Sequence, residues 1–123
     1  MKKLLIIIGL LFCSSVSAEW VLYYESASYG DKYWYEDKRI RVRGDNVFVW
    51  TRTKNKEKTR GLIGSAQTYF KINCDEYSYQ FLQSDYYSDF NWTNLLNEGK
   101  PSEVNFIPPN SNIETLADIV CKK

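Results

Sequence analysis

The chain has 123 residues, of which 44% are hydrophobic and 25% are charged, and its formal net charge is +1. This length corresponds to one domain, and a net charge near zero gives no global argument for binding nucleic acid or membranes. The sequence contains no histidine. It therefore lacks the commonest general base and the commonest metal ligand, so we predict a non-enzymatic protein without catalytic residues, metal or cofactor.

The first 18 residues have the three regions of a secretory signal peptide. Two lysines precede an apolar run from residue 4 to 12, and small residues then lead to Ala18. The run is half the length of about 20 residues that a membrane-spanning helix needs. We therefore expect a domain from Glu19 to Lys123 that is periplasmic, secreted or on the cell surface. The bulky Phe12 before Cys13 argues against lipidation, and Cys13 is expected to leave with the signal peptide.

The domain begins with segments whose residue types predict β-strands. Polar stretches separate them, including a lysine-rich loop at 53–60 and a long loop at 88–102 that has room for a helical turn at 93–97. A hairpin with residues 44–46 in its loop would place Ile40 and Val42 on one face with Phe48 and Trp50, and the arginines on the other. The predicted strands are 20–24, 32–35, 38–43, 47–51, 65–74, 77–86 and an edge strand at 104–107.

The last quarter of the chain predicts one short amphipathic helix. Ser111 is a suitable N-cap, and Glu114 three residues later completes a capping box. Four apolar residues then recur at helical spacing and form one stripe. They are Ile113, Leu116, Ala117 and Val120.

Two cysteines remain after the signal peptide is removed. Cys74 shares one face of a strand with Phe70 and Ile72, and Cys121 lies at the edge of the helix's apolar stripe. In an oxidising compartment this pair favours a Cys74–Cys121 disulfide over two free thiols. The predicted fold class is α+β: a curved antiparallel sheet of five to six strands, with one C-terminal helix tied to the sheet by the disulfide.

Charge is distributed unevenly along the domain. The segment from residue 38 to 60 has a net charge of +7, and the segment from 74 to 118 has −7. A basic hairpin and loop indicate a site for an acidic partner, while a charged edge that prevents aggregation is the competing explanation. The candidate binding residues in this segment are Arg39, Arg41, Arg43, Lys54, Lys56, Lys58 and Arg60.

Aromatic residues make up 16% of the chain, too many for all of them to be buried in a small domain. Exposed tyrosine and tryptophan are typical of recognition surfaces, whereas packing on strands explains about half of them. We add Trp34, Tyr86 and Trp92 to the candidate partner-binding residues.

The order of these motifs resembles that of the bacterial surface-adhesin protein E family. A strand ending in tryptophan is followed by a strand ending in cysteine, a proline-containing entry and a short helix ending in the second cysteine. The resemblance implies an antiparallel sheet with a disulfide-tied helix in an exported envelope protein. The family's namesake is a lipid-anchored adhesin that binds host matrix and serum proteins. The motifs are Val47–Trp50, Phe70–Asp75, Tyr77, Tyr79, Ile107–Ser111 and Leu116–Cys121.

Three functional hypotheses follow. The first is an adhesin-like module that binds a host matrix or serum protein, or an acidic glycan, through its basic and aromatic β surface. The second is a periplasmic inhibitor or accessory subunit that binds another envelope protein. A hydrolase is the third. None of them requires nucleic acid, a cofactor or a transmembrane segment.

Overall fold

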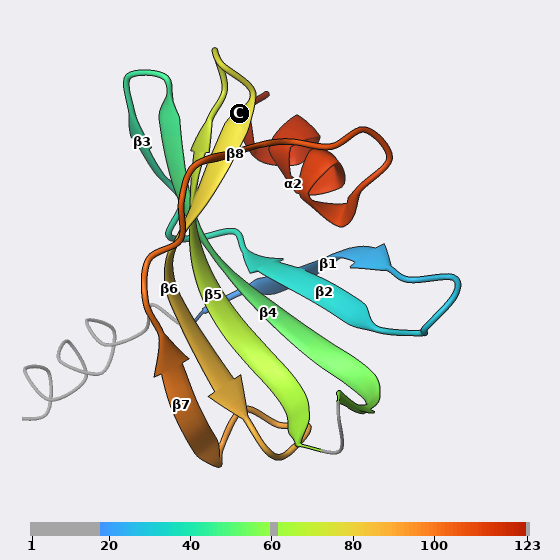
Figure 1. The fold of residues 1–123 in the computed structure, drawn as a ribbon. Coiled ribbons are helices and arrows are strands. Elements are labelled where there is room, and N and C mark those ends of the chain that lie inside the picture. The colour runs from blue at the N-terminus through green and yellow to red at the C-terminus, as the bar shows by residue number, and fades with distance from the viewer. Residues whose placement is uncertain (1–17, 60–61, 123) are drawn as a thin grey trace, which may run out of the picture.

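The computed structural model describes residues 18–59 and 62–122. The predicted signal peptide and Cys13 lie outside these ranges, apart from Ala18. The described ranges contain eight strands and one helix, which is labelled α2 in Figure 1. The elements are β1 (Trp20–Glu25), β2 (Lys32–Glu36), β3 (Arg41–Arg43), β4 (Asn46–Thr59), β5 (Ile63–Asn73), β6 (Ser78–Tyr87), β7 (Leu95–Gly99), β8 (Asn105–Phe106) and α2 (Asn112–Val120).

All strands belong to one antiparallel sheet. Its main path has the order β1-β2-β4-β5-β6-β7, while β3 pairs with β4 and β8 pairs with β6. Figure 1 shows that this sheet is strongly twisted and that α2 lies near the end that carries β3 and β8. The predicted fold class is therefore confirmed.

The hydrophobic core lies between α2 and one face of the sheet. Val49 of β4 and Ile72 of β5 are fully buried there, together with Leu116 and Val120 of α2. Val49 alternates with the buried Val47 along β4, and Ile72 with the buried Phe70 along β5, so all four point to the same face. The predicted apolar stripe of the helix is confirmed, since all four of its residues are buried.

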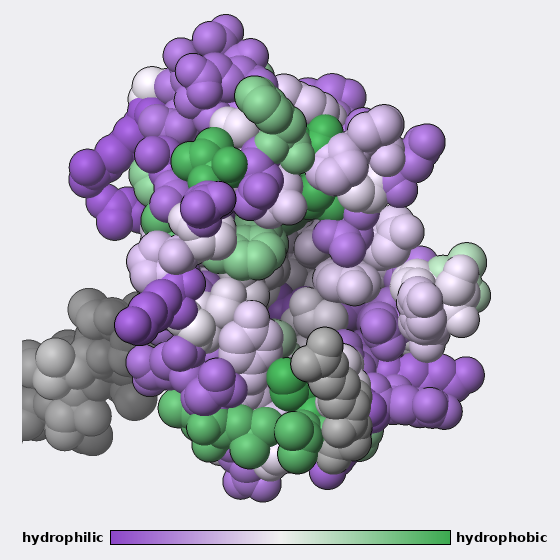
Figure 2. All heavy atoms as spheres, viewed as in Figure 1, coloured by the Kyte–Doolittle hydropathy of each residue, from purple (hydrophilic) through white to green (hydrophobic). Residues whose placement is uncertain are grey.

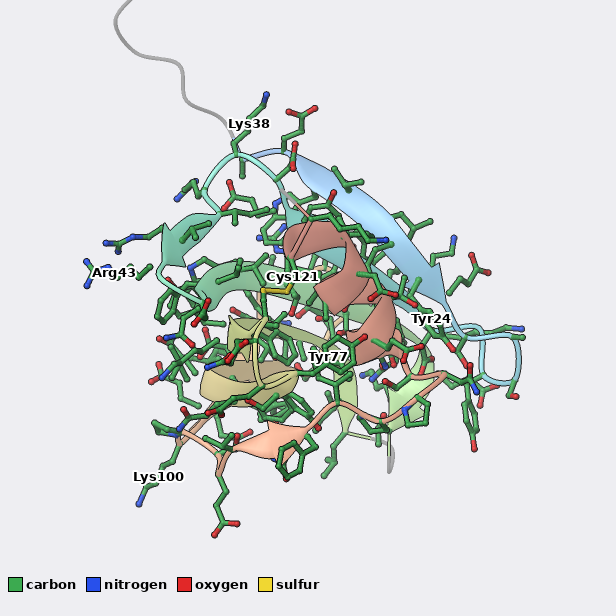
Figure 3. The ribbon with its side chains drawn as sticks, turned by 90° about the horizontal axis from the view of Figure 1, so that it is seen from above. Tyr24, Lys38, Arg43, Tyr77, Lys100 and Cys121 are labelled. Atoms are coloured by element: carbon green, nitrogen blue, oxygen red, sulfur yellow. A yellow bond between two sulfur atoms is a disulfide. The ribbon has the colours of Figure 1, made fainter. Side chains whose placement is uncertain are left out.

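The disulfide that ties α2 to the sheet is present. Cys74 follows β5, Cys121 ends α2, and their Cα atoms are 5.7 Å apart. Figure 3 shows this bond beside the labelled Cys121, at the end of the helix and over the sheet. The predicted pairing is confirmed.

The helix begins largely as predicted. The Ser111 hydroxyl accepts a hydrogen bond from the Glu114 backbone N–H at 3.2 Å, which satisfies one of the free donors of the first turn. The Glu114 carboxylate, however, accepts from the Asn110 N–H at 3.1 Å instead of the Ser111 N–H of a capping box. Asn110 has a φ of +60°, and this left-handed turn brings its N–H within reach of Glu114.

Two predicted loops are wrong because the sheet continues through them. Residues 53–59 of the lysine-rich segment form the second half of β4, which pairs with β2 and β5 up to Lys54 and with β5 again at Thr59. The Asn55 amide donates to the Ile63 carbonyl and helps to hold this extension. The long loop at 88–102 contains β7, which pairs with the end of β6, so no helical turn forms at 93–97. Both extensions are largely exposed, which explains the polar composition of the β4 extension.

The predicted register of the β3–β4 hairpin is also wrong. Arg43 pairs with Asn46, so the loop consists of Gly44 and Asp45 alone. Gly44 has a φ of +58°, and a two-residue hairpin with glycine in its first loop position fits the twist of the sheet. The shift of one residue inverts the faces: Arg41 lies opposite Phe48 on one face and Val42 opposite Val47 on the other. The predicted strand from residue 38 is shortened to three residues.

Apolar side chains also gather away from the core. Figure 2 shows them at the lower end of the sheet, where β7 begins. Leu62 in the β4–β5 turn and Leu95 and Leu96 of β7 are exposed. This patch is separate from the helix and its core.

Candidate binding site on the outer face of the sheet

We call the sheet face that packs on α2 the helix face, and the opposite one the outer face. On β4 the buried side chains of the helix face alternate with residues that point outward. Because a strand has a side-chain period of two, these residues form one row along the outer face. The row consists of Phe48, Trp50, Arg52, Lys54 and Lys56.

Arg52 is held between tryptophan rings at the middle of this row. Its guanidinium carbon lies 4.4 Å from the centre of the Trp20 ring and 4.8 Å from that of Trp92. Trp34, from β2, meets Trp92 edge-on with ring centres 5.8 Å apart. The Arg52 Nε donates a hydrogen bond of 2.9 Å to the side chain of Gln67, which fixes the plane of the guanidinium. We call Trp20, Trp34, Arg52 and Trp92 the tryptophan–arginine cluster.

The charge of Arg52 is partly withdrawn from water. Burial lowers the pKa of its guanidinium, and the nearby Tyr87 acts in the opposite direction. Arginine nevertheless stays charged at neutral pH. The two ion pairs between described residues are Lys38–Glu19 and Arg39–Glu36, so Arg52 takes part in neither. A cation in this setting attracts an anionic group more strongly than one in open water.

The position of Trp92 is set by backbone contacts of the 88–94 loop. Its indole N–H donates to the carbonyl oxygens of Thr53 and Ala66, at 3.1 and 3.0 Å. Its backbone N–H donates to the hydroxyl of the fully buried Ser65. The residue adopts a φ of +56°, which is uncommon for a large side chain and is held here by these three bonds.

Two hollows meet at Trp34. The smaller one, about 220 Å³, is lined by the four residues of the tryptophan–arginine cluster. The larger one, about 480 Å³, is lined by Trp34 and by three lysines. We call it the lysine pocket. Its lining residues are Gly30, Lys32, Trp34, Lys54, Asn55, Lys56, Phe90 and Asn91.

A third hollow lies at the other end of the row. It has a volume of about 240 Å³ and is lined by Arg41, Arg43, Phe48, Tyr69 and Leu82. Tyr69 stacks on Trp50 with ring centres 4.6 Å apart, which joins this hollow to the middle of the face. The outer face therefore has cations at both ends and aromatic rings between them.

The structure brings together six of the predicted binding residues. Lys54, Lys56, Trp34 and Trp92 lie around the two hollows that meet at Trp34. Arg41 and Arg43 line the third hollow, and Figure 3 shows Arg43 projecting away from the sheet. These residues come from β2, β3, β4 and the 88–94 loop.

Other predicted residues lie elsewhere. Arg39 precedes β3 and pairs with the buried Glu36, so the predicted row of three arginines does not form. Tyr86 pairs with Ala66 on the helix face, away from Trp34 and Trp92. Lys58 lines a neighbouring hollow near the end of β4, which shares Lys56 with the lysine pocket. Arg60 lies outside the described residues.

Sequence reasoning missed Trp20, Lys32 and Arg52 as site residues. The available signal was alternation: from residue 48 to 58, even positions carry aromatic and basic side chains, and odd positions carry smaller apolar and polar ones, apart from the acidic Glu57. The prediction of a loop from residue 53 interrupted this pattern. Arg52 was therefore separated from the lysines that continue its row.

The family model described as "Surface-adhesin protein E" matches residues 20–122. The chain belongs to this family. No curated protein matches the sequence. Membership in the surface-adhesin protein E family supports a surface adhesin.

Solved structures of Haemophilus influenzae protein E have the same fold as this family member. The selenomethionine form is 15% identical, with a TM-score of 0.60 and coverage of 89% of this chain and 90% of that one. Crystal form II is 16% identical, with a TM-score of 0.59 and coverage of 88% and 91%. At this identity the likeness shows the fold alone. No helix in the described part of this chain is long and apolar enough to cross a membrane.

Proposed function

We propose that this member of the surface-adhesin protein E family is an exported adhesin-like protein that binds an acidic macromolecular partner through its outer face, without catalysis. The observation that carries the proposal is the position of Arg52 between the rings of Trp20 and Trp92. The partner is proposed to be a host matrix or serum protein, in keeping with the adhesin family. Export is proposed to use residues 1–18 as the signal peptide.

The tryptophan–arginine cluster has the composition of an interaction hot spot. Tryptophan and arginine are enriched among residues whose truncation costs about 2 kcal/mol or more of binding free energy. The Gln67 contact and the two flanking rings already hold the Arg52 side chain in one orientation. Binding therefore loses little side-chain entropy, and the planar guanidinium can meet a carboxylate through two parallel hydrogen bonds.

The surrounding cations have a different role from Arg52. Lys54, Lys56, Arg41 and Arg43 are exposed, so each ion pair they form contributes about 0–1 kcal/mol. Together they attract an acidic surface over a longer range and orient it on the outer face. Binding is therefore expected to weaken as salt concentration rises, because salt screens these exposed charges.

The test measures binding of the exported domain to immobilised extracellular matrix extract and, in parallel, to bacterial envelope extract. Arg52→Gln and Trp34→Ala are expected to weaken matrix binding by about tenfold or more, as hot-spot residues do. Lys100→Gln is the matched control, because Lys100 is exposed beyond β7 and lies in none of the three hollows of the outer face.

Equal matrix binding by Arg52→Gln, Trp34→Ala and the unaltered domain would overturn the proposal. Capture of a single bacterial envelope protein, without matrix binding, would also overturn it and favour an inhibitor or accessory subunit. Circular dichroism of each variant confirms that the fold is retained before binding is compared.

A further inference from the structure

We infer that the outer face binds a sulfated glycan chain, with sulfate groups in the lysine pocket and sugar rings against the adjoining tryptophans. The inference rests on the proposed function, because it names the ligand class of the same surface. Three features carry it: the arrangement of the lysines, the composition of the wall they share, and the length of the row along β4.

The lysine pocket gathers positive charge at a cost to the free protein. Lys32 and Lys54 lie directly opposite each other in the pairing of β2 with β4. Like charges in this position destabilise a sheet, by an amount of the order of 0.2–1 kcal/mol. Lys56 lies two residues further along the same row, and all three line one hollow. An anion bound in that hollow would offset the repulsion between the lysines, because it could form an ion pair with each of the three.

Asp31, an acidic residue next to Lys32 in the chain, is held by the backbone of β4. The Asp31 carboxylate accepts a hydrogen bond of 3.0 Å from the backbone N–H of Lys56. The other lining groups are neutral: the amides of Asn55 and Asn91, the rings of Trp34 and Phe90, and Gly30. The hollow, about 480 Å³, has the size of a small-molecule site and can admit a sulfated sugar residue.

The wall shared by the two hollows favours a sugar over an acidic peptide. Trp34 lines both hollows, and Trp92 stands beside it. The C–H-rich face of a sugar ring packs on an indole ring, so a glycan can use the tryptophans and the lysines together. Peptides are commonly bound by adding a strand to a sheet edge. The row on β4 offers no such edge, because β4 is paired with β2 and β3 on one side and with β5 on the other.

The row is long enough for several charged sugars. From Lys56 to Phe48 it spans eight residue steps of β4, or about 27 Å at the rise of a strand. Arg41 and Arg43 lie at the far end, beside Phe48. A chain that carries sulfates along its length would meet the lysine pocket, then Arg52, then these two arginines. A single sulfate would occupy one of these positions only.

The experiment titrates heparin oligosaccharides of increasing length into the exported domain by calorimetry. The lysine-pocket variant is Lys32→Gln/Lys54→Gln/Lys56→Gln. The charge-matched control is Lys38→Gln/Lys100→Gln/Lys122→Gln, whose residues line none of the hollows of the outer face. Affinity is expected to rise with oligosaccharide length until the chain spans about 27 Å. The lysine-pocket variant should lose about tenfold or more, and the control less than about threefold, through net charge alone.

Three further arms test the ligand class. Chemically desulfated heparin should not bind, since no sulfates would occupy the lysine pocket. Trp34→Ala should weaken binding of heparin at high salt, where the contribution of screened ion pairs is small. Equal affinity for polyglutamate and heparin, or equal losses in the two triple variants, would overturn the inference.

One further experiment distinguishes a failure of the glycan inference from a failure of the proposed function. Matrix extract is treated with heparin-degrading enzymes and tested again with the unaltered domain and Arg52→Gln. If the domain does not bind heparin but still binds treated matrix in an Arg52-dependent way, the glycan inference is wrong and the proposed function stands. If Arg52→Gln binds matrix as well as the unaltered domain does, the proposed function is wrong as well.

Discussion

Gly64 lies directly against the backbone of Asp89. A Cβ atom placed on Gly64 would stand 2.6 Å from the Asp89 carbonyl oxygen, which is closer than non-bonded carbon and oxygen atoms approach. The same oxygen accepts a hydrogen bond of 2.7 Å from the Ser65 hydroxyl. Asp89 begins the loop that carries Trp92 to the outer face. The absence of a side chain at residue 64 therefore helps to position the tryptophan–arginine cluster.

Gly64→Ala is accordingly expected to displace the loop and Trp92. Overpacking of this kind costs about 1–3 kcal/mol, measured by urea unfolding, and the near-ultraviolet circular dichroism of the tryptophans should change. Gly44→Ala is the control: it is strained by a φ of +58° but has no atom within 4 Å of the added Cβ. It should leave the tryptophan signal unchanged. An unaltered tryptophan spectrum in Gly64→Ala would contradict this role.

The conformation of the same loop is expected to depend on pH. Its Asp89 carboxylate accepts hydrogen bonds from the Thr93 hydroxyl and from the N–H groups of Asn94, Thr93 and Asn91. These bonds, that from the Thr93 hydroxyl first, hold the pKa of the Asp89 carboxyl well below its ordinary value of 3.8. A lowered pKa in the folded state stabilises the loop above that ordinary value, and the stabilisation is lost as pH falls toward the folded pKa.

The NMR signals of the Thr93 and Asn94 amides should therefore stay constant down through pH 3.8 and shift only well below it, as the pH approaches the lowered pKa of Asp89 in the folded protein. Asp89→Ala should show displaced loop signals already at neutral pH. Asp75→Ala, in the exposed β5–β6 turn, should leave them in place. Loop signals that are unchanged in Asp89→Ala would show that the carboxylate does not hold the loop.

Removal of the disulfide is expected to release the C-terminal helix. Cys74 and Cys121 are 47 residues apart, and closing a loop of that length stabilises by about 4 kcal/mol on the chain-entropy model. Cys74→Ser/Cys121→Ser should lower the free energy of unfolding by this order and increase hydrogen exchange in α2 first. Tyr77→Phe removes the neighbouring hydrogen bond between Tyr77 and Asp118, which is exposed and should matter far less. A loss below about 1 kcal/mol in the double variant would contradict the prediction.

Replacement of Arg39 is expected to destabilise the fold, unlike replacement of Arg41 or Arg43. The Arg39 Nε lies 3.1 Å from a carboxylate oxygen of Glu36, whose side chain is only 3% exposed. Arg39→Gln leaves this buried carboxylate without its counter-charge, at a cost of about 1–3 kcal/mol. The exposed Arg41→Gln and Arg43→Gln should each stay within about 0.5 kcal/mol of the unaltered protein. Thermal unfolding of the three variants checks this, and equal stability would show that the ion pair contributes nothing.

Local sequence patterns were enough to predict the features that depend on neighbouring residues or on composition. Ser111 and the stripe through Leu116 predicted the start and the buried side of α2, because capping and helical periodicity are local. Two cysteines after the predicted signal peptide led to the prediction of the Cys74–Cys121 bond. The alternation of Phe70, Ile72 and Cys74 identified the face of β5 that would meet the helix.

Only the tertiary structure decided which residues share the outer face. The faces of β3 depend on a hairpin register in which a shift of one residue moves Arg41 from one side of the sheet to the other. The extension of β4 beyond Thr51 depends on pairing with β2 and β5. Its residues are polar on both faces, so they do not show the alternation of apolar and polar residues that predicts a half-buried strand. The meeting of Arg52 with Trp92 depends on a loop distant in sequence folding back onto β4 and β5. Such contacts arise from pairing and packing between segments, which local pattern does not contain.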